Sequence, residues 1–268
     1  MLRRLGLDNA QLRLVDIYTR HHREQLLGAE LVVRSGLVEA GSEGLRLYHE
    51  LVNAQRGEVA ATFVHRLSKV GADSLPTSLI EKAAVDAVAI PAYGQSRSIS
   101  LDLDPSVDAP SLELLIERGL AMRKVRSVTA SECDEAGDLL SEFIPSLTWE
   151  GEPLDQRAFD EWLIDGPAGE KMGWAMMETR MVLHGRARVG DRIQSFGALV
   201  DIADKTTQNI NWVFNVESGE LLTVFQGVNL AFDTVERRAM VIPDEARARD
   251  EQRCHRDLAP DANNRRAR

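Results

Sequence analysis

The sequence predicts an α+β fold in which two copies of one antiparallel β unit follow each other along the chain. Two observations support this prediction: segments recur at a constant spacing, and the strongest apolar patterns alternate with a period of two. The chain has 268 residues, of which 44% are hydrophobic. That length suits one large domain or two domains of about 130 residues, each with its own core.

The internal repeat has an offset of 162 residues, which is the spacing between His22 and His184. The segment from His22 to Gly28 resembles the segment from His184 to Gly190, and the same offset brings further identities into line without a gap. These identities are Leu37 with Leu199, Val38 with Val200, Asn53 with Asn215, Gly57 with Gly219, Glu58 with Glu220, and Phe63 with Phe225. Conservative matches, such as Asp16 with Glu178, lie between them. We therefore expect both halves to fold alike.

The strands follow from alternation. In residues 209–216 the apolar side chains Ile210, Trp212 and Phe214 share one face of a strand, and asparagines occupy the other. A second alternating strand is expected over 222–232. Gly219 and its counterpart Gly57 lie in short polar loops that predict hairpin turns.

Helical signals are fewer. A capping-box pattern at Ser78 predicts a short helix to about Val88, and leucines over 112–120 indicate another. A third helix is expected over 154–163, ended by Gly166 and Pro167.

These patterns divide the chain into four parts. We assign 1–91 to the first copy, 92–126 to a linker with a short helix, 127–245 to the second copy, and 246–268 to a flexible basic tail. The tail holds seven arginines and four acidic residues, which is typical of a solvated terminus or of a phosphate-binding arm.

Composition excludes several classes of protein. The 42 acidic residues outnumber the 32 basic ones, so a general nucleic-acid binder is disfavoured. No apolar run reaches the roughly 18 residues of a membrane span, and the start of the chain lacks a signal peptide. Cys133 and Cys254 supply neither a disulfide scaffold nor a zinc site. Glycine-rich nucleotide motifs are absent too, and we expect a cytoplasmic globular protein.

The tandem sheets and one acidic motif resemble the double hotdog fold. Within it, the chain is similar to the 4-hydroxybenzoyl-CoA thioesterase-like family of acyl-CoA thioesterases. That family has an Asp-x-Asp-x-x-Gly pattern between its first strand and its central helix. Here the second acid falls on Asp134 and the glycine on Gly137, within the segment Ser131-Glu-Cys-Asp-Glu-Ala-Gly-Asp138. Two departures are Glu132 at the first acid and Asp138 where many members have His.

The likeness covers most of 10–90 and 127–243, and it makes the first copy incomplete. If the second copy begins near Ser127, the first copy lacks its first strand, its acidic loop and most of its central helix. We expect residues 1–12 to be the end of that helix and the turn after it. A truncated gene model is the favoured explanation, and completion by a partner is the other.

The resemblance implies hydrolysis of an acyl-CoA or related carrier thioester, with CoA as part of the substrate and no separate cofactor. Asp134 would be the nucleophile or general base, and the backbone at Gly137 and Asp138 would supply the oxyanion donor. The candidate substrate-binding residues are His184, Arg186 and Arg188, with the arginines facing CoA phosphates. An unpaired sheet edge would favour a homo-oligomer.

Other interpretations stay open. Ser131 and Asp134 match a capping box, and Asp138 matches a helix N-cap, so these acids would then only begin a helix. Glu142 or Glu161 could carry the carboxylate, as in another branch of hotdog thioesterases. The alternative functions are a non-catalytic acyl-CoA-binding or structural protein and a hotdog hydratase or dehydratase.

Overall fold

The computed structural model describes residues 12–70, 75–149, 152–154, 164–165 and 171–260. The chain divides into two compact units. The first contains residues 1–101 together with the middle of one later strand, Met177–Met181, and the second contains the rest. Among the described helices, none is both long and apolar enough to cross a membrane.

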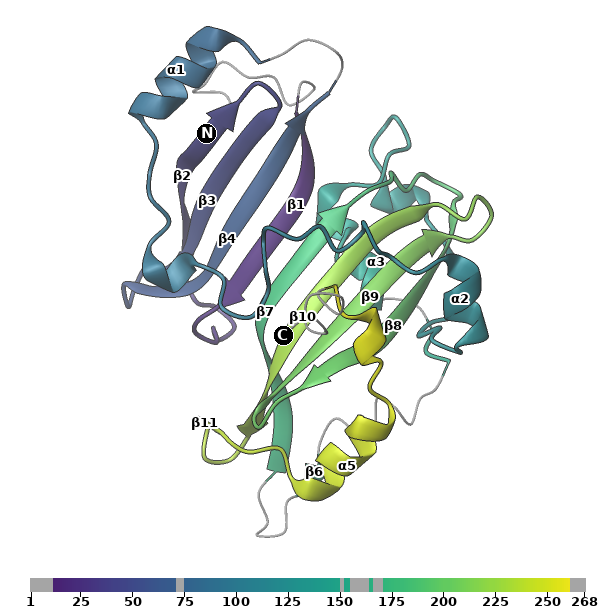
Figure 1. Cartoon of the computed structure of the whole chain (residues 1–268). Helices are drawn as coiled ribbons and strands as arrows, with labels where there is room; N and C mark the ends of the chain where they lie inside the picture. The colour runs from purple at the N-terminus through teal and green to yellow at the C-terminus, as the bar shows by residue number, and fades with distance from the viewer. Residues whose placement is uncertain (1–11, 71–74, 150–151, 155–163, 166–170, 261–268) are drawn as a thin grey trace. The chain divides into compact units, whose positions relative to one another are not determined.

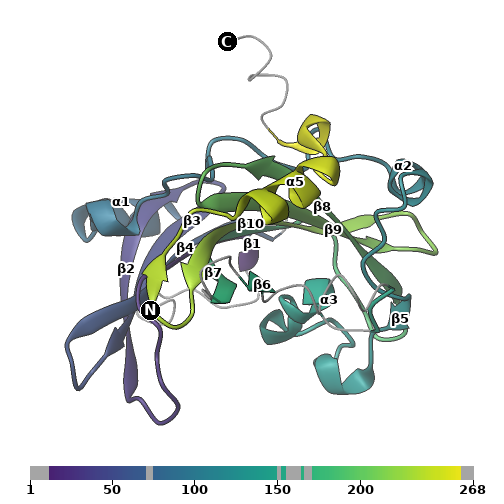
Figure 2. The same cartoon turned by 90° about the horizontal axis from the view of Figure 1, so that it is seen from below.

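The first unit is an antiparallel sheet with strand order β2-β3-β4-β1. Both views place one helix, α1, beside the edge strand β2 (Figures 1 and 2). Apolar side chains of this unit form a core of leucines that includes Leu37, Leu47 and Leu75. The elements are β1 (Leu12–His21), β2 (Leu31–Gly41), β3 (Gly44–Asn53), β4 (Glu58–Lys69) and α1 (Thr77–Val85).

The second unit repeats this plan with more helical cover. Its main strands run in the order β10-β9-β8-β5, while β11 pairs with β10 and β6 with β7. The helix α3 lies on the inner side of this curved sheet (Figure 2), where its Leu147 packs with Ile193 and Val213. The elements are α2 (Leu112–Glu117), β5 (Arg126–Ser127), α3 (Ser146–Trp149), β6 (Ile164–Asp165), β7 (Lys171–Leu183), β8 (Arg192–Ile202), β9 (Thr206–Asn215), β10 (Leu221–Asp233), β11 (Arg238–Ala239) and α5 (Asp244–Gln252).

The structure confirms the repeat. Strands β3 and β9 begin and end at equivalent residues, 44–53 and 206–215. A break in strand register also recurs: it lies between Leu37 and Glu39 in β2 and between Leu199 and Asp201 in β8. Each break is a β-bulge or irregularity at the same repeat position, so the two copies share a departure from regular pairing as well as their strands.

The hairpin turns recur in atomic detail. The Asn53 side-chain oxygen accepts hydrogen bonds from the backbone N–H groups of residues 55 and 56. Asn215 does the same with residues 217 and 218. The following glycines, Gly57 and Gly219, have φ values of 68° and 73°, which a residue with a Cβ adopts at a cost. The predicted hairpins are therefore confirmed.

The repeat extends past the last strand of each unit. After α1, the Val88 N–H donates to the Leu37 carbonyl oxygen at 2.7 Å. After α5, the His255 N–H donates to the Leu199 carbonyl oxygen at 2.7 Å. Leu37 and Leu199 are equivalent residues, so each copy ends with a helix whose following segment returns to the edge of its own sheet.

This arrangement differs from the predicted flexible tail over 246–268. Residues 244–252 form α5, and Ala246 on it is buried in a cluster with Met172, Ile202, Ala231 and Ile242. The segment 244–252 is rich in charged residues and shows no apolar periodicity, since it packs against the sheet through one small side chain. The sequence pattern therefore gave no sign of this helix. Residues 261–268 lie outside the described residues.

The helices predicted near 78–88 and 112–120 are confirmed as α1 and α2. Most of the third, 154–163, and the predicted helix remnant at the start of the chain lie outside the described residues. The first unit also extends to residue 101 instead of 91. Backbone N–H groups of residues 97, 98 and 99 donate to one buried carboxylate, that of Glu178, and hold the segment in place.

Candidate active site

The acidic motif forms a tight hairpin turn in the second unit. Cys133 and Leu139 make an antiparallel bridge across it. Inside the turn, the Asp134 N–H donates to the Asp138 carbonyl oxygen at 2.9 Å, and the Gly137 N–H donates to the Asp134 carbonyl oxygen at 3.0 Å. Gly137 has a φ of 81°, so glycine suits this position of the turn.

The Asp134 carboxylate is exposed to solvent and held by its own turn. Its Oδ1 accepts the N–H of Ala136 at 2.9 Å and the N–H of Asp138 at 3.0 Å. The N–H groups of Gly137 and Asp138, expected as oxyanion donors, therefore already donate within the turn. Two hydrogen bonds thus hold one oxygen of this exposed carboxylate in place.

This turn is not the start of a helix. Both interpretations of the motif, as a catalytic site at a helix N-terminus and as a simple helix cap, predicted a helix here. The next helical turn covers only Ser141–Phe143. The reason is a contact distant in sequence: the Leu139 N–H donates to the Ala187 carbonyl oxygen at 3.0 Å, which continues the bridge where a helix would begin.

The structure brings the predicted catalytic and substrate-binding segments together. The Asp138 carboxylate accepts from Arg186 Nη1 at 3.1 Å and from Arg188 Nε at 2.9 Å. The Val189 N–H donates to the Gly137 carbonyl oxygen at 3.0 Å. Two guanidinium groups thus offset the negative charge of Asp138 and still face solvent. His184 lies just after β7, where its backbone N–H donates to the Leu222 carbonyl oxygen.

Glu132, the first acid of the motif, has a structural role. Its side chain closes a capping box with Thr129 and pairs with Arg126 at 3.1 Å. Burial raises the pKa of this carboxyl, but the hydrogen bonds from Thr129 and the charge of Arg126 outweigh burial, so the net pKa is lowered. The capping box therefore begins at Thr129 and not at Ser131.

Cys133 is a poor nucleophile here. Burial raises the pKa of its thiol, and so do the neighbouring carboxylates of Glu132 and Asp134. A raised pKa keeps the thiol protonated at neutral pH, whereas thioester attack needs the thiolate.

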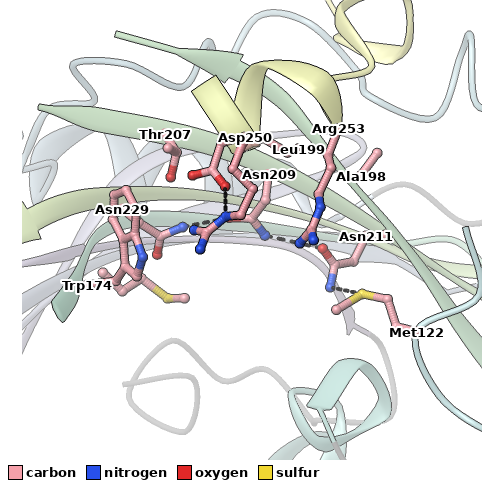
Figure 3. Close-up of a pocket in the computed structure, with 13 residues that line it drawn as sticks. Met122, Trp174, Ala198, Leu199, Thr207, Asn209, Asn211, Asn229, Asp250 and Arg253 are labelled. Atoms are coloured by element: carbon pink, nitrogen blue, oxygen red, sulfur yellow. Dashed lines mark hydrogen bonds and ion pairs between the residues drawn. The ribbon is translucent and has the colours of Figure 1, made fainter. Parts of the chain in front are cut away.

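The second unit also contains a cavity of about 290 Å³ between the strands and α5 (Figure 3). Asparagine side chains form one side of this cavity, called its floor below, and apolar and charged side chains line the rest. The described lining residues, which include none of the predicted site residues, are Met122, Trp174, Met176, Gly197, Ala198, Leu199, Thr207, Asn209, Asn211, Asn229, Arg249, Asp250 and Arg253.

Three asparagines form a directed row on the floor of this cavity. Asn229 Nδ2 donates to Asn209 Oδ1 at 2.9 Å, and Asn209 Nδ2 donates to Asn211 Oδ1 at 3.2 Å. Asn211 Nδ2 then lies 3.3 Å from the sulfur of Met122. Strand alternation places Asn209 and Asn211 on the same face of β9 as Val213, which packs against α3. The row offers amide donors and acceptors to a polar ligand.

Charged groups complete the cavity. Arg249 pairs with Asp250 at 3.2 Å, and Figure 3 shows Arg253 reaching toward the asparagine row. The sequence pattern had placed the asparagines opposite the apolar face of the strand but carried no sign that α5 would cover them. No group of three potential metal-ligating side chains occurs among the residues that the structure describes.

Neither a family model nor a curated protein matches the sequence. Solved structures do match the fold. A 12:0-ACP thioesterase from Umbellularia californica is 8% identical, with a TM-score of 0.55 over 82% of this chain and 73% of that one. An acyl-ACP thioesterase from Bacteroides thetaiotaomicron is 10% identical, with a TM-score of 0.55 over 81% and 76%. A protein described as an oleoyl thioesterase from Lactobacillus plantarum is 11% identical, with a TM-score of 0.56 over 86% and 82%.

The fold is a tandem hotdog. Within the second hotdog copy, the acidic turn follows the short strand β5 and precedes α3. A catalytic role for the residues of this turn stays a prediction.

Proposed function

We propose that this tandem hotdog protein hydrolyses an acyl thioester carried on CoA or on an acyl carrier protein. The observation that carries the proposal is the fold likeness to three thioesterases over more than four fifths of the chain. Within the hotdog proteins, the Asp134–Gly137 motif favours the 4-hydroxybenzoyl-CoA thioesterase-like group. CoA would be part of the substrate, with no separate cofactor.

Asp134 would act as the general base. Its carboxylate would take a proton from water while the water oxygen bonds to the acyl carbon. The carbon–sulfur bond then breaks, the thiolate takes up the proton, and a free acid and a thiol leave. The turn supports this role because it fixes one carboxylate oxygen through two N–H groups and leaves the other exposed.

Arg186 and Arg188 would bind the phosphates of the carrier. Both guanidinium groups lie beside the acidic turn, and both side chains are more than half exposed. Phosphate carries more charge than the Asp138 carboxylate and has several acceptor oxygens, so it would compete for these arginines.

A non-catalytic thioester-binding protein is the second candidate. One observation favours it: the N–H groups of Gly137 and Asp138 already donate inside the turn, so they are not open to a thioester oxygen. In that case the arginines would hold the carrier and no thiol would be released.

The test compares two substitutions of one residue. Asp134→Asn keeps an oxygen that accepts both N–H groups but removes the charge, whereas Asp134→Ala removes both. We expect hydrolysis of acyl-CoA and acyl-ACP panels, followed with a free-thiol reagent, to fall about 100-fold or more in both variants. Only Asp134→Ala should also lose stability, by about 1 kcal/mol.

Glu135→Gln, a change at an adjacent exposed acid, is the matched control and should leave the rate unchanged. Hydrolysis that survives Asp134→Asn would remove Asp134 from the mechanism. Binding of acyl-CoA by calorimetry without any thiol release would support the binding protein instead.

A further inference from the structure

The two hotdog copies differ at one sheet edge. In the second copy, an earlier segment of the chain covers the outer edge of β8 from Arg192 to Gly197. Ile193 pairs with Arg126, the Met122 N–H donates to the Ser195 carbonyl oxygen, and the Gly197 N–H donates to the Leu120 carbonyl oxygen. This edge therefore has hydrogen-bonding partners from residues 120–127.

The equivalent edge of the first copy is open within the part of the chain that the structure describes. Residues 31–36 of β2 correspond to 193–198 of β8, and strand order places β2 at the end of its sheet. Among the described residues, the backbone bond to this outer edge comes from Val88 and reaches only Leu37. Leu31, Val32 and Val33 are 40%, 40% and 64% exposed, so the described residues leave a large part of these side chains open to solvent.

Backbone direction shows which groups point outward. The Glu30 carbonyl oxygen accepts from the Ala54 N–H, so Glu30 faces β3, whereas the Leu37 carbonyl oxygen faces outward to Val88. Because direction alternates along an antiparallel strand, Leu31, Val33 and Ser35 present their N–H and C=O groups outward. An exposed row of this kind is a template for another strand.

The usual protections of a free edge are weak here. Between Leu31 and Gly36 there is one charged residue, Arg34, and no proline. The register break of β2 lies further along, between Leu37 and Glu39. Soluble proteins normally blunt such an edge with charges, proline or a bulge, so an apolar open stretch is a candidate interface.

The stretch is also complementary to itself. We propose that β2 pairs with β2 of a second copy of this chain, antiparallel, about a two-fold axis at Val32. This register places Leu31 opposite Val33 of the second copy, so their outward N–H and C=O groups bond. It places Glu30 opposite Arg34 of the second copy, and the two-fold axis makes that ion pair twice. The proposal does not depend on thioester chemistry.

Sedimentation velocity of the 268-residue chain tests the interface. We expect a concentration-dependent dimer. Arg34→Glu places the new glutamate of each copy opposite Glu30 of the other, so two acidic groups face each other on both sides of the axis. We expect the dissociation constant of the dimer to rise roughly tenfold. Adding Glu30→Arg restores opposite charges and should restore the dimer. Arg56→Glu, the same charge change in the exposed β3–β4 turn, is the matched control and should have no effect.

Crosslinking tests the register. Position 32 would face itself as a non-hydrogen-bonded pair with Cα atoms about 4.5 Å apart, which suits a disulfide. With Cys133 and Cys254 replaced by serine, Val32→Cys should form a covalent dimer under mild oxidation, and Arg56→Cys should not. A monomer at every concentration would overturn the proposal. A dimer that neither responds to Arg34→Glu nor crosslinks through position 32 would overturn it equally.

Discussion

At the scale of single residues, equivalent positions of the repeat hold different buried acids. Asp16 accepts hydrogen bonds from the Arg180 guanidinium, with the shortest at 2.7 Å, and Arg180 is 1% exposed. Glu178, at the equivalent position, accepts three backbone N–H groups. Burial and the nearby Glu178 carboxylate both raise the pKa of Tyr18. The sequence match of Asp16 with Glu178 therefore carries no information about the different buried contacts of the two acids.

One histidine of the first unit, His65, makes a pH-dependent contribution to the free energy of unfolding. Burial, with a smaller effect from His49, lowers the pKa of His65 to about 4. An unfolded histidine titrates near 6.5, so between pH 6.5 and 4 the unfolded chain binds the proton more readily. The contribution is therefore complete above about pH 6.5 and is lost as the pH falls toward 4. It amounts to at most about 3 kcal/mol.

Replacing this histidine should flatten the pH profile. We expect the thermal midpoint of the wild type to fall more steeply between pH 6.5 and 4.5 than that of His65→Phe, which cannot be protonated. Thermal unfolding followed by circular dichroism in matched buffers measures both profiles. Parallel profiles would show that His65 is not the responsible group.

At the scale of elements, two segments depart from what their residues favour locally. The acidic motif has the composition of a helix start, yet its carboxylate caps a hairpin turn, because residues beyond it pair with the segment around Ala187. The segment 244–252 is highly charged, yet it forms a helix docked through one buried alanine. In both cases a contact with a distant segment outweighs the local preference.

Docking of α5 can be tested through that alanine. Ala246 is 2% exposed within an apolar cluster, so Ala246→Arg would bury a charge and overfill the site. We expect a loss of about 3 kcal/mol in stability and release of the helix from the sheet. Ala248→Arg, an exposed position on the same helix, should change neither.

Urea unfolding gives the stability of both variants, and limited proteolysis near residue 244 reports release of the helix. Equal behaviour of the two variants would contradict the docked arrangement. Arg249 and Asp250 line the cavity from the same helix, so Ala246→Arg should also disturb the cavity in Figure 3.

At the scale of the whole molecule, the two copies share the same asparagine-capped hairpin turn, but the asparagine is more buried in the first copy than in the second. Asn53 caps its turn and also donates to Gln25 Oε1 at 2.8 Å, and it is 3% exposed. Asn215 caps its turn from a less buried position. We expect Asn53→Ala to cost more than Asn215→Ala, with each loss on the order of 1–2 kcal/mol.

Aspartate separates the two contributions. Asn215→Asp keeps the accepting oxygen and should be close to neutral, whereas Asn53→Asp loses the donor to Gln25 and should destabilise the protein. Thermal midpoints of the four variants measure both effects. Equal losses at the two aspartates would mean that the Gln25 contact contributes nothing.

The sequence by itself determined the repeat, the hairpin turns, two short helices and the class of fold. These features depend on neighbouring residues: Asn53 and Gly57 suffice to shape one turn, and alternation suffices to make a strand. Only the tertiary structure decided that Asp134 belongs to a turn and that α5 covers the asparagine row. It also decided that the described residues cover part of the outer edge of β8 but leave the equivalent edge of β2 open. Each of these features depends on contacts between segments far apart in the chain, and a local pattern of side chains does not predict which distant segments will pair.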